Sequence, residues 1–401
     1  MKSYVADLPT GEQITYTDKK RWFWMLAFPY ALLPFSGIIP HALTGNEWWF
    51  GLPILLTYVA GPVLDWLMGE DENNPPQEVI SQLEQDKYYR HITYACVPLH
   101  YISFLGSAAY AATQDLGVAA FLALAIVAGL TSGLAINTAH ELGHKNSKIE
   151  KQLAKLALAV PAYGHFSVDH NLGHHRNVST PKDPASSRMG ESIYKFARRE
   201  LPGAFFEAWA LEKDRLSRRG MIAWHPKNQI LQSFAISGLM AALLIWAFGW
   251  VMVPFILIHH FFAWWQLTSA NYVEHYGLLR QKDETGKYER CQPHHSWNSN
   301  HKFSNLVLLH LERHSDHHTH PTRRYQSLKH YDDLPSLPSG YFGTYLLAYI
   351  PQLWFKVMDK KLLALPQVEG DLDRVNIDPD AKPSLFLKYG RDKMNEPTIV
   401  L

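Results

Sequence analysis

The histidines are the residues of this chain whose type and spacing most directly indicate chemistry. Nine of them fall in four short clusters between residues 140 and 318, and three clusters have the patterns HxxxH, HxxxHH and HxxHH. On a helix, side chains three or four residues apart share a face, so each pattern directs two or three ring nitrogens towards one point. Neutral imidazole is a common ligand of first-row transition metals, and nine ligands are too many for one ion. We therefore predict a two-metal centre whose ligands are His140, His144, His170, His174, His175, His275, His314, His317 and His318.

An acidic residue stands beside a histidine in every cluster. Neighbours on a helix point about 100° apart, so such an acid is poorly placed to join the metal that its neighbour binds. It is better placed to hold the ring of a histidine from another cluster, because a ligating imidazole needs a partner for its second nitrogen. The alternative is that these acids only balance charge near a cationic site. We favour the orienting role for Glu141, Asp169, Glu274 and Asp316.

The first cluster, His140-Glu-Leu-Gly-His144, is also an HExxH sequence. Alone, that pattern is typical of a zinc protease in which the glutamate, here Glu141, acts as a general base. Such a protease uses two histidines and one further ligand, and it has no use for seven more imidazoles. The ligand count therefore favours the two-metal interpretation over a zinc intramembrane protease.

The composition divides the chain into a strongly apolar part and an ordinarily polar part. Of 401 residues, 47% are apolar and 19% are charged, and the mean hydropathy is −0.18. Lys plus Arg number 38 against 37 for Asp plus Glu, so the net charge of +1 gives no reason to expect a nucleic acid partner. The two cysteines, Cys96 and Cys291, favour a reducing compartment and are too few for a four-thiolate site. The N-terminus lacks a basic region followed by an apolar core, so we expect no cleavable signal peptide.

Six apolar runs are each about as long as the ~20 residues that cross a hydrocarbon core, a length that soluble core helices rarely reach. Lys and Arg lie before the first run, after the second and after the fourth, whereas the first and third connections have none. Cytoplasmic loops accumulate these residues. We therefore predict an all-α membrane protein, a six-helix transmembrane bundle with a cytoplasmic helical cap that carries the histidine-rich two-metal site. The runs are Trp22–Ile39, Trp48–Met68, His91–Ala112, Leu116–Ala139, Ile230–Phe248 and Val251–Tyr272.

This topology places every histidine cluster at the cytoplasmic mouth of the bundle, with both termini on the same side. The apolar segment Tyr341–Met358 contains Pro351, and an interfacial helix on the cytoplasmic surface fits it better than a seventh span. The expected divisions are a cytoplasmic N-terminus at 1–21, four transmembrane helices in 22–139, a cytoplasmic region with two histidine clusters at 140–229, two transmembrane helices in 230–272, and a cytoplasmic C-terminal region with the remaining clusters at 273–401.

Four motifs together resemble the integral-membrane alkane 1-monooxygenases. These enzymes belong to the histidine-box group that includes membrane fatty-acid desaturases and xylene monooxygenase. The resemblance runs from the first span to about Leu328, and the stretch Asn-Tyr-x-Glu-His-Tyr-Gly separates alkane hydroxylases from desaturases. The motifs are Asn137-Thr-Ala-His-Glu-Leu-Gly-His144, His170-Asn-Leu-Gly-His-His175 with Thr180-Pro-Lys-Asp-Pro184, Asn271-Tyr-Val-Glu-His-Tyr-Gly277, and Leu311-Glu-Arg-His-Ser-Asp-His-His318.

The resemblance implies a non-haem centre of two iron ions in the bacterial inner membrane. It implies that the nine histidines hold the irons and that dioxygen and two electrons hydroxylate the terminal carbon of a medium-chain alkane drawn from the bilayer. It also implies that rubredoxin, itself reduced by rubredoxin reductase, donates the electrons. The two cysteines are too few for a fused rubredoxin domain, so we expect rubredoxin to dock from the cytosol. The alternatives are a desaturase or related hydroxylase acting on lipid-linked chains, the zinc protease, and a metal transporter, which would place its ligands near the membrane midplane.

The ligand faces can be extended backwards along the two helices that carry His140 and His275. Residues three, four and seven before His140, and four, seven, eight and eleven before His275, share a face with those rings. We expect them to line an apolar tunnel that presents the chain end first. For the glycine, close helix packing is an equally good explanation. The predicted lining is Gly133, Ile136, Asn137, Trp264, Leu267, Thr268 and Asn271.

Basic residues in the cytoplasmic regions are candidates for a docking face. An acidic electron carrier would be attracted to such a face, although positive charge near the inner leaflet also attracts anionic lipid. The candidate docking residues are Arg198, Arg199, Arg215, Arg218 and Arg219, with Lys213, Arg323 and Arg324 as further members.

Overall fold

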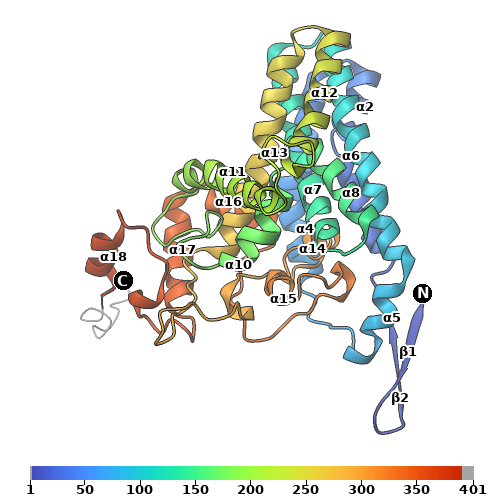
Figure 1. The fold of residues 1–401 in the computed structure, drawn as a ribbon. Helices are drawn as coiled ribbons and strands as arrows, with labels where there is room; N and C mark the ends of the chain where they lie inside the picture. Colours follow the sequence, from blue (N-terminus) through green and yellow to red (C-terminus); the bar gives the residue numbers. More distant parts are fainter. Residues whose placement is uncertain (1, 391–401) are drawn as a thin grey trace, which may run out of the picture.

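A bundle of long helices stands on a base that contains one further long helix, several short helices and loops (Figure 1). The computed structural model describes residues 2–390. The bundle includes the long helices α6 (Lys87–Thr113), α7 (Val118–Gly143), α12 (Gln229–Phe248) and α13 (Met252–His275). The base contains α8 (Lys148–Ala159), α11 (Ile193–Ser217), α14 (Lys302–Val307), α15 (His314–Thr319) and α18 (Lys382–Tyr389), and every histidine cluster lies where the bundle meets the base.

Three helices among residues 2–390 are long and apolar enough to cross a membrane. They are Glu47–Met68, Val118–Gly143 and Gln229–Phe248. A fourth span forms if the pair Phe23–Ala31 and Phe35–Thr44, bent by 56°, is counted as one. The bend lies next to Pro34, which has no backbone N–H to continue the first helix. Length and composition therefore support a membrane protein with three or four such helices, fewer than the six predicted.

The other two predicted spans are long helices of mixed polarity. The 27 residues of α6 and the 24 of α13 would suffice to span a bilayer, but both carry histidines and tyrosines along their length. His259 in α13 is buried, with Nε2 2.7 Å from Ser132 Oγ of α7, so this polar ring faces the bundle and not its surroundings. The six-span topology stays a prediction.

Large apolar side chains remain exposed on the outside of the bundle. Leu239, Leu243 and Trp246 of α12 are more than half exposed, and the exposed fraction of Trp246 is 85%. A soluble monomer seldom exposes such a contiguous apolar surface, whereas lipid covers it without cost. Trp48 and Trp250, at helix ends, are also exposed, as is typical of rings at a membrane interface.

Glycines let α7 approach α13 closely. A Cβ atom on Gly129 would lie 2.5 Å from the backbone oxygen of His259, and one on Gly133 would lie 2.5 Å from Cβ of Gln266. Neither contact is tolerable without a shift, so the absence of a side chain sets the separation of the two helices. Because α7 carries His140 and α13 carries His275, this packing also fixes the distance between two histidine clusters.

The segment predicted to be an interfacial helix is broken into two. Helix α16 (Tyr341–Ala348) ends before Ile350, and α17 (Pro351–Leu363) begins with the proline. Tyr341, Trp354 and Met358 are fully buried in a core shared with α13. The segment packs one face of each short helix against the end of α13, and neither piece is long enough to span a bilayer. Its position at the membrane surface stays a prediction.

The N-terminus departs from the predicted all-helical fold. Strands β1 (Ser3–Asp7) and β2 (Gln13–Thr17) form an antiparallel hairpin in which Ser3 pairs with Thr17. Tyr4 is buried, and its hydroxyl donates a hydrogen bond to Asp86 Oδ2 at 2.7 Å. Asp86 caps α6, so this contact fastens the hairpin to the first turn of that helix. In Figure 1 the hairpin and α18 both lie at the base end, opposite the turn between α12 and α13.

Candidate metal centre

The nine clustered histidines gather into two adjacent groups. Five rings form the first group and four form the second, and within each group one nitrogen of every ring lies within 4.8 Å of the others. The groups touch, since the ring centroids of His175 and His318 are 4.4 Å apart. The five-histidine group is His140, His144, His170, His175 and His317, and the four-histidine group is His174, His275, His314 and His318.

The spacing of the nitrogens suits metal ions. In the five-histidine group, Nε2 of His317 lies 2.8 Å from Nε2 of His140 and 3.2 Å from Nε2 of His175. In the four-histidine group, Nε2 of His314 lies 3.3 Å from that of His275 and 2.9 Å from that of His318. Nitrogens bound to one ion at about 2.1 Å and at right angles would lie about 3.0 Å apart.

Hydrogen bonds alone cannot satisfy these rings. In a neutral imidazole each ring nitrogen either donates one hydrogen bond or accepts one. A single Nε2 atom therefore cannot form hydrogen bonds to two neighbouring Nε2 atoms at the same time. Nε2 of His144 and Nε2 of His174 are buried without any hydrogen-bond partner. Buried polar atoms are normally paired, so the donor set fits one cation in each group.

The second and fourth clusters are divided between the groups. Residues 170–174 form a π-helical turn, labelled η5, between α9 (Phe166–Asp169) and α10 (His175–Asn177). The wider turn aligns His170 with His175, whose Nε2 atoms are 3.0 Å apart, and sends His174 to the other group. In α15, His314 and His318 share one face while His317 points into the five-histidine group. The expectation that each cluster serves a single point is therefore wrong for these two.

Burial keeps these rings neutral. Removal from water lowers the pKa of His144, His170, His175, His317 and His318 well below 6.5, and neighbouring rings lower it further. Neutral imidazole is the form that binds a metal, so at neutral pH these ligands need to lose no proton first.

His174 differs because a carboxylate faces its second nitrogen. Burial alone would lower the pKa of His174, but Asp183, whose Oδ2 lies 2.9 Å from Nδ1, outweighs that effect and raises it. In the neutral ring the same contact keeps the proton on Nδ1 and leaves Nε2 free for a metal. Asp183 also accepts a hydrogen bond from Ser186 Oγ at 2.6 Å. The sequence analysis did not select Asp183, although it lies in the quoted Thr180–Pro184 motif.

Of the four acids predicted to orient ligand rings, Glu274 alone contacts one of the nine histidines. Its Oε2 lies 3.3 Å from Nε2 of His314, while Oε1 accepts a hydrogen bond from Tyr341 at 2.7 Å. Glu274 thus lies beside the metal-facing nitrogen of His314, where it could itself bind a metal. This position differs from the predicted one, in which the acid would hold the outer nitrogen of a ring.

The other three acids have different partners. Glu141 lies 3.1 Å from Lys145 Nζ, which is four residues along the same chain segment. Asp316 is bound by Arg323 and Tyr331 and by His320, which belongs to neither group. Oδ1 of Asp169 is buried without a partner. The contacts of Glu141 and Asp316 are thus with groups outside the nine rings, and the orienting role of these three acids stays a prediction.

A third group of possible ligands, Glu289, His294 and His295, does not require a metal. Nδ1 of His295 accepts a hydrogen bond from the backbone N–H of Gln292 at 2.9 Å, so the ring proton is on Nε2. That nitrogen lies 3.3 Å from Oε1 of Glu289 and can donate to it directly. The group is satisfied as an ordinary hydrogen-bonded pair.

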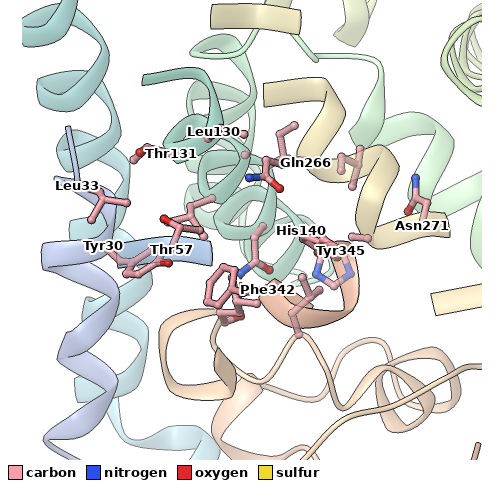
Figure 2. Close-up of a pocket in the computed structure, with 18 of the residues that line it drawn as sticks. Tyr30, Leu33, Thr57, Leu130, Thr131, His140, Gln266, Asn271, Phe342 and Tyr345 are labelled. Atoms are coloured by element: carbon pink, nitrogen blue, oxygen red, sulfur yellow. Dashed lines mark hydrogen bonds between the residues drawn. The ribbon is translucent and has the colours of Figure 1, made fainter. Parts of the chain in front are cut away.

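An apolar cavity runs from inside the bundle to both histidine groups (Figure 2). It encloses about 830 Å³ of space free of atoms, part of it open to the surroundings. At one end it is lined by His140, His170, His314 and Glu274, and towards the other by residues such as Leu33, Pro53, Val127 and Leu130. The wall on α7 from Val127 to His140 is ~20 Å long at 1.5 Å per residue. Figure 2 shows Leu33 and Leu130 away from His140.

Most of the predicted tunnel residues line this cavity. Gly133, Ile136, Asn137, Leu267 and Asn271 all belong to its wall. Asn137 also donates a hydrogen bond from Nδ2 to the backbone oxygen of Leu308 at 2.7 Å, which ties α7 to the loop before α15.

Trp264 and Thr268 lie elsewhere. Trp264 donates from Nε1 to the backbone oxygen of Pro161, and Thr268 donates from Oγ1 to Glu200. The cavity face of α13 consists of Gln266, Leu267, Ala270, Asn271 and Glu274, the residues that share a face with Glu274. The predicted face was counted back from His275, which is one residue after Glu274. A shift of one residue turns a helical face by about 100°, so the prediction included Trp264 and Thr268, which do not line the cavity.

Two of the five predicted docking arginines have structural roles. Arg199 donates to both carboxylate oxygens of the buried Glu191 and to the backbone oxygen of Pro184. Arg215 makes two hydrogen bonds of 2.6 Å to Glu212. Three remain exposed on the base: Arg218, which pairs with Asp214, together with Arg198 and Arg219.

Comparison with known proteins matches the region that builds this centre. A fatty acid desaturase family model matches residues 117–345, which include all four clusters. Alkane 1-monooxygenase of Ectopseudomonas oleovorans is 52% identical over 375 residues, covering 94% of this chain and 93% of that protein. The chain belongs to the alkane 1-monooxygenase family. Alkane 1-monooxygenase 1 of Alcanivorax borkumensis is 49% identical over 375 residues, covering 94% and 92% of the two chains.

Membership of the alkane 1-monooxygenase family confirms the resemblance drawn from the motifs and makes the chain an oxidoreductase. A more distant relative is the hydroxylase component of xylene/toluene monooxygenase from Pseudomonas putida, 28% identical over 246 residues that cover 60% of this chain and 63% of that protein. The alkane 1-monooxygenases match along nearly the whole chain, so the similarity includes the cavity wall as well as the histidines.

Proposed function

We propose that this protein hydroxylates the terminal carbon of medium-chain n-alkanes, using dioxygen and two electrons, at two iron ions held by the nine histidines. The observation that carries the proposal is the apolar cavity that ends at His140, His170 and His314, members of both histidine groups. The iron pair would supply an oxidant strong enough to attack a C–H bond that offers no handle to an acid or a base. The five-histidine group would hold one ion and the four-histidine group, with Glu274 beside it, the other.

The protein positions the alkane and excludes water from it. An alkane dissolved in the bilayer can enter between apolar side chains. The part of the cavity lined by Leu33, Val127 and Leu130 would admit the alkane lengthwise. Its terminal carbon then meets the histidine end of the cavity first. Selectivity for the end of the chain follows from shape, because an alkane has no polar group that a hydrogen bond could hold.

We propose that the base faces the cytosol of a bacterial inner membrane, with six helices crossing the bilayer, and that rubredoxin docks there. The exposed Arg198, Arg218 and Arg219 would attract an acidic carrier. Reversing Arg218 and Arg219 to Glu together should slow reduction by rubredoxin at low salt and have less effect at high salt. Lys282→Glu, in an exposed loop, is the matched control. Unchanged reduction rates at low salt would remove these arginines from the docking face.

The fatty acid desaturase family match makes desaturation the second candidate. The two reactions differ in product, since a hydroxylase gives an alcohol and a desaturase gives an alkene. The zinc protease loses support because the carboxylate of Glu141, which would have to act on a metal-bound water, is engaged by Lys145.

The deciding experiment combines metal analysis with product analysis on one preparation. Purified protein should contain two irons per chain and little zinc, and with rubredoxin, its reductase and a medium-chain alkane it should yield the 1-alcohol by gas chromatography. One zinc per chain, or an alkene as the product, would contradict the proposal. His317→Ala removes a ring from the five-histidine group and should lower iron content, whereas His41→Ala, far from both groups in the sequence, should not.

A further inference from the structure

The proposed hydroxylation consumes protons as well as electrons. One oxygen atom of dioxygen enters the alkane and the other leaves as water, so each turnover takes up two electrons and two protons. Most of the cavity that receives the alkane is lined by apolar side chains, which cannot carry protons. The following inference rests on the proposed function and concerns how protons reach the histidines.

A second, smaller and more polar cavity lies beside the first. Its wall includes Tyr163, His165, Asp169 and Glu200. Three of these side chains have buried polar atoms without a hydrogen-bond partner: the hydroxyl of Tyr163, both ring nitrogens of His165, and Oδ1 of Asp169. Buried polar atoms without a partner around a small cavity are the usual setting of bound water, which satisfies several of them at once.

This cavity adjoins both histidine groups. His170 of the five-histidine group and His174 of the four-histidine group line it. His170, Leu267 and Asn271 also line the apolar cavity, so the two spaces share a wall. Figure 2 shows Asn271 at the edge of the apolar cavity opposite Leu33.

Glu200 is a carboxyl group of the polar cavity that stands apart from the histidine clusters in sequence and contacts Asn271 of the shared wall. It is 1% exposed, and it lies in α11. Oε2 accepts a hydrogen bond from Thr268 at 2.8 Å and Oε1 accepts one from Asn271 at 3.1 Å. Burial raises the pKa of Glu200 to about 7 in spite of these two bonds, so the acid and the carboxylate are both present near neutral pH.

The next carboxyl group lies about two helical turns further along α11. Glu207 is half-buried, and its Oε1 lies next to Gly173 on the same side as Oδ1 of Asp169. A Cβ atom on Gly173 would meet these two oxygens at 3.0 and 3.1 Å. The glycine therefore leaves room for both carboxyl groups between the surface and the polar cavity.

We propose that Glu200 is a proton-relay residue that passes protons from the polar cavity to the histidine-lined space where dioxygen is reduced. The carboxylic acid releases its proton to water in the polar cavity, beside the shared wall of His170 and Asn271, and the carboxylate that remains is held by Thr268 and Asn271. Bulk water near Glu207 then restores the proton. One such cycle runs for each of the two protons consumed, and Glu200 is unchanged at the end.

The first test separates proton transfer from simple support of α13. Glu200→Gln keeps a side chain that can accept a hydrogen bond from Thr268 but carries no exchangeable acid. Thr268→Val removes the bond and keeps the acid. Glu200→Gln should lower kcat by about tenfold or more, enlarge the solvent isotope effect, and release peroxide as electrons are consumed without alcohol. In Thr268→Val the amount of alcohol formed per pair of electrons consumed should stay at the wild-type value.

Glu212→Gln is the matched control, because Glu212 is a buried carboxyl group of the same helix that is bound by Arg215. It should lower stability without changing the coupling. Normal turnover and coupling in Glu200→Gln, or the same loss in Thr268→Val as in Glu200→Gln, would overturn the relay.

A second test needs neither metal nor substrate. In the metal-free protein at neutral pH, infrared spectra in H2O and D2O should contain a carboxylic acid C=O component that is missing from Glu200→Gln. An unchanged spectrum would mean that Glu200 is not protonated there, and the relay would fail whatever the enzyme oxidises. If instead the component is present and wild-type protein forms no alcohol from any alkane, the proposed function fails and the protonation of Glu200 stands.

Discussion

A histidine binds a metal only through a nitrogen that carries no proton, so the group on its other nitrogen matters as much as the ring. For His174 that group is Asp183, which is buried and further held by Ser186. Replacing Asp183 with asparagine removes the negative charge behind His174 and keeps a side chain of the same shape. Asp183→Asn should weaken metal binding to the four-histidine group by about 10- to 100-fold, the usual cost of losing a carboxylate behind a ligating ring.

The measurement is iron content per chain after dialysis against a graded series of chelator concentrations. Asp183→Asn should lose about one of two irons at chelator levels that wild type withstands. Glu284→Gln, in an exposed loop, should behave as wild type. Equal retention of both irons in Asp183→Asn would show that Asp183 does not set the proton position on His174.

Asp71 gives a second prediction at the residue scale, on stability against acid. Burial favours protonation of Asp71, but Lys20, 2.6 Å from Oδ2, and Arg313 outweigh it and lower the pKa of Asp71 from 3.8 to about 2. A carboxyl group with a lowered pKa in the folded state stabilises the fold above its unfolded pKa and loses that effect as the pH falls through the folded value.

The stabilisation by Asp71 should therefore be complete above about pH 4 and vanish towards pH 2. Thermal unfolding of metal-free wild type and Asp71→Asn, followed from pH 6 downwards, tests this. The difference in Tm should be constant down to about pH 4 and then shrink. A difference that stays constant to pH 3 would mean that the ion pair with Lys20 does not form in solution.

At the scale of elements, the close approach of α7 and α13 is what brings their histidines together. Gly129→Ala would put a Cβ atom 2.5 Å from a backbone oxygen of α13, which cannot move aside as a flexible side chain could. We expect a loss of about 1–3 kcal/mol of stability, the usual cost of overpacking, and a lower iron content. Gly238→Ala in α12 is the matched control, since a Cβ atom there meets nothing within 4 Å.

Detergent-solubilised protein would be compared by thermal unfolding and iron analysis. Gly238→Ala should be at least as stable as wild type, because alanine favours a helix more than glycine does. If Gly129→Ala unfolds at the wild-type temperature with full iron content, the two helices are not held at the separation that glycine permits.

The elements also show what a sequence can and cannot predict. The helices ending at Met68, Gly143 and Phe248 were predictable as apolar spans, the second from a run that was expected to end at Ala139, because uninterrupted apolar stretches of that length have few other uses. The π-helical turn at 170–174 was not, because one residue inserted into a helix leaves no mark in composition. The spacing HxxxHH is the same whether His174 and His175 serve one metal or two, so their division could only come from three-dimensional structure.

The site shows the same limit. All nine rings were identifiable from their spacing, yet Asp183 was not singled out and Glu200 was not considered, because neither stands in a histidine cluster. Their roles depend on α11 and the loop before it folding back against α13, and long-range contacts of that kind are not periodic. Thr268 was placed in the tunnel because a face was counted from His275, when the cavity follows Glu274 one residue earlier.

At the scale of the whole molecule, the two ends of the bundle differ in charge. At the base end, Lys87 and Arg90 begin α6, and Lys145 and Lys148 follow α7. At the opposite end, the turns 114–117 and 249–251 contain neither Lys nor Arg. Cytoplasmic loops are enriched in these residues, so the base with its histidines should face the cytosol, where soluble electron carriers are found.

Single cysteines test this orientation when both native cysteines are replaced by alanine. Glu284→Cys lies in an exposed loop of the base, and Trp250→Cys replaces an exposed residue at the far turn, 80% accessible. A membrane-impermeant maleimide should label Glu284→Cys only in inside-out vesicles and Trp250→Cys only in intact cells. The reverse pattern would put the histidines outside the cell, beyond the reach of a cytosolic donor. Labelling of both from one side would show that the polypeptide between them crosses the bilayer an even number of times or not at all.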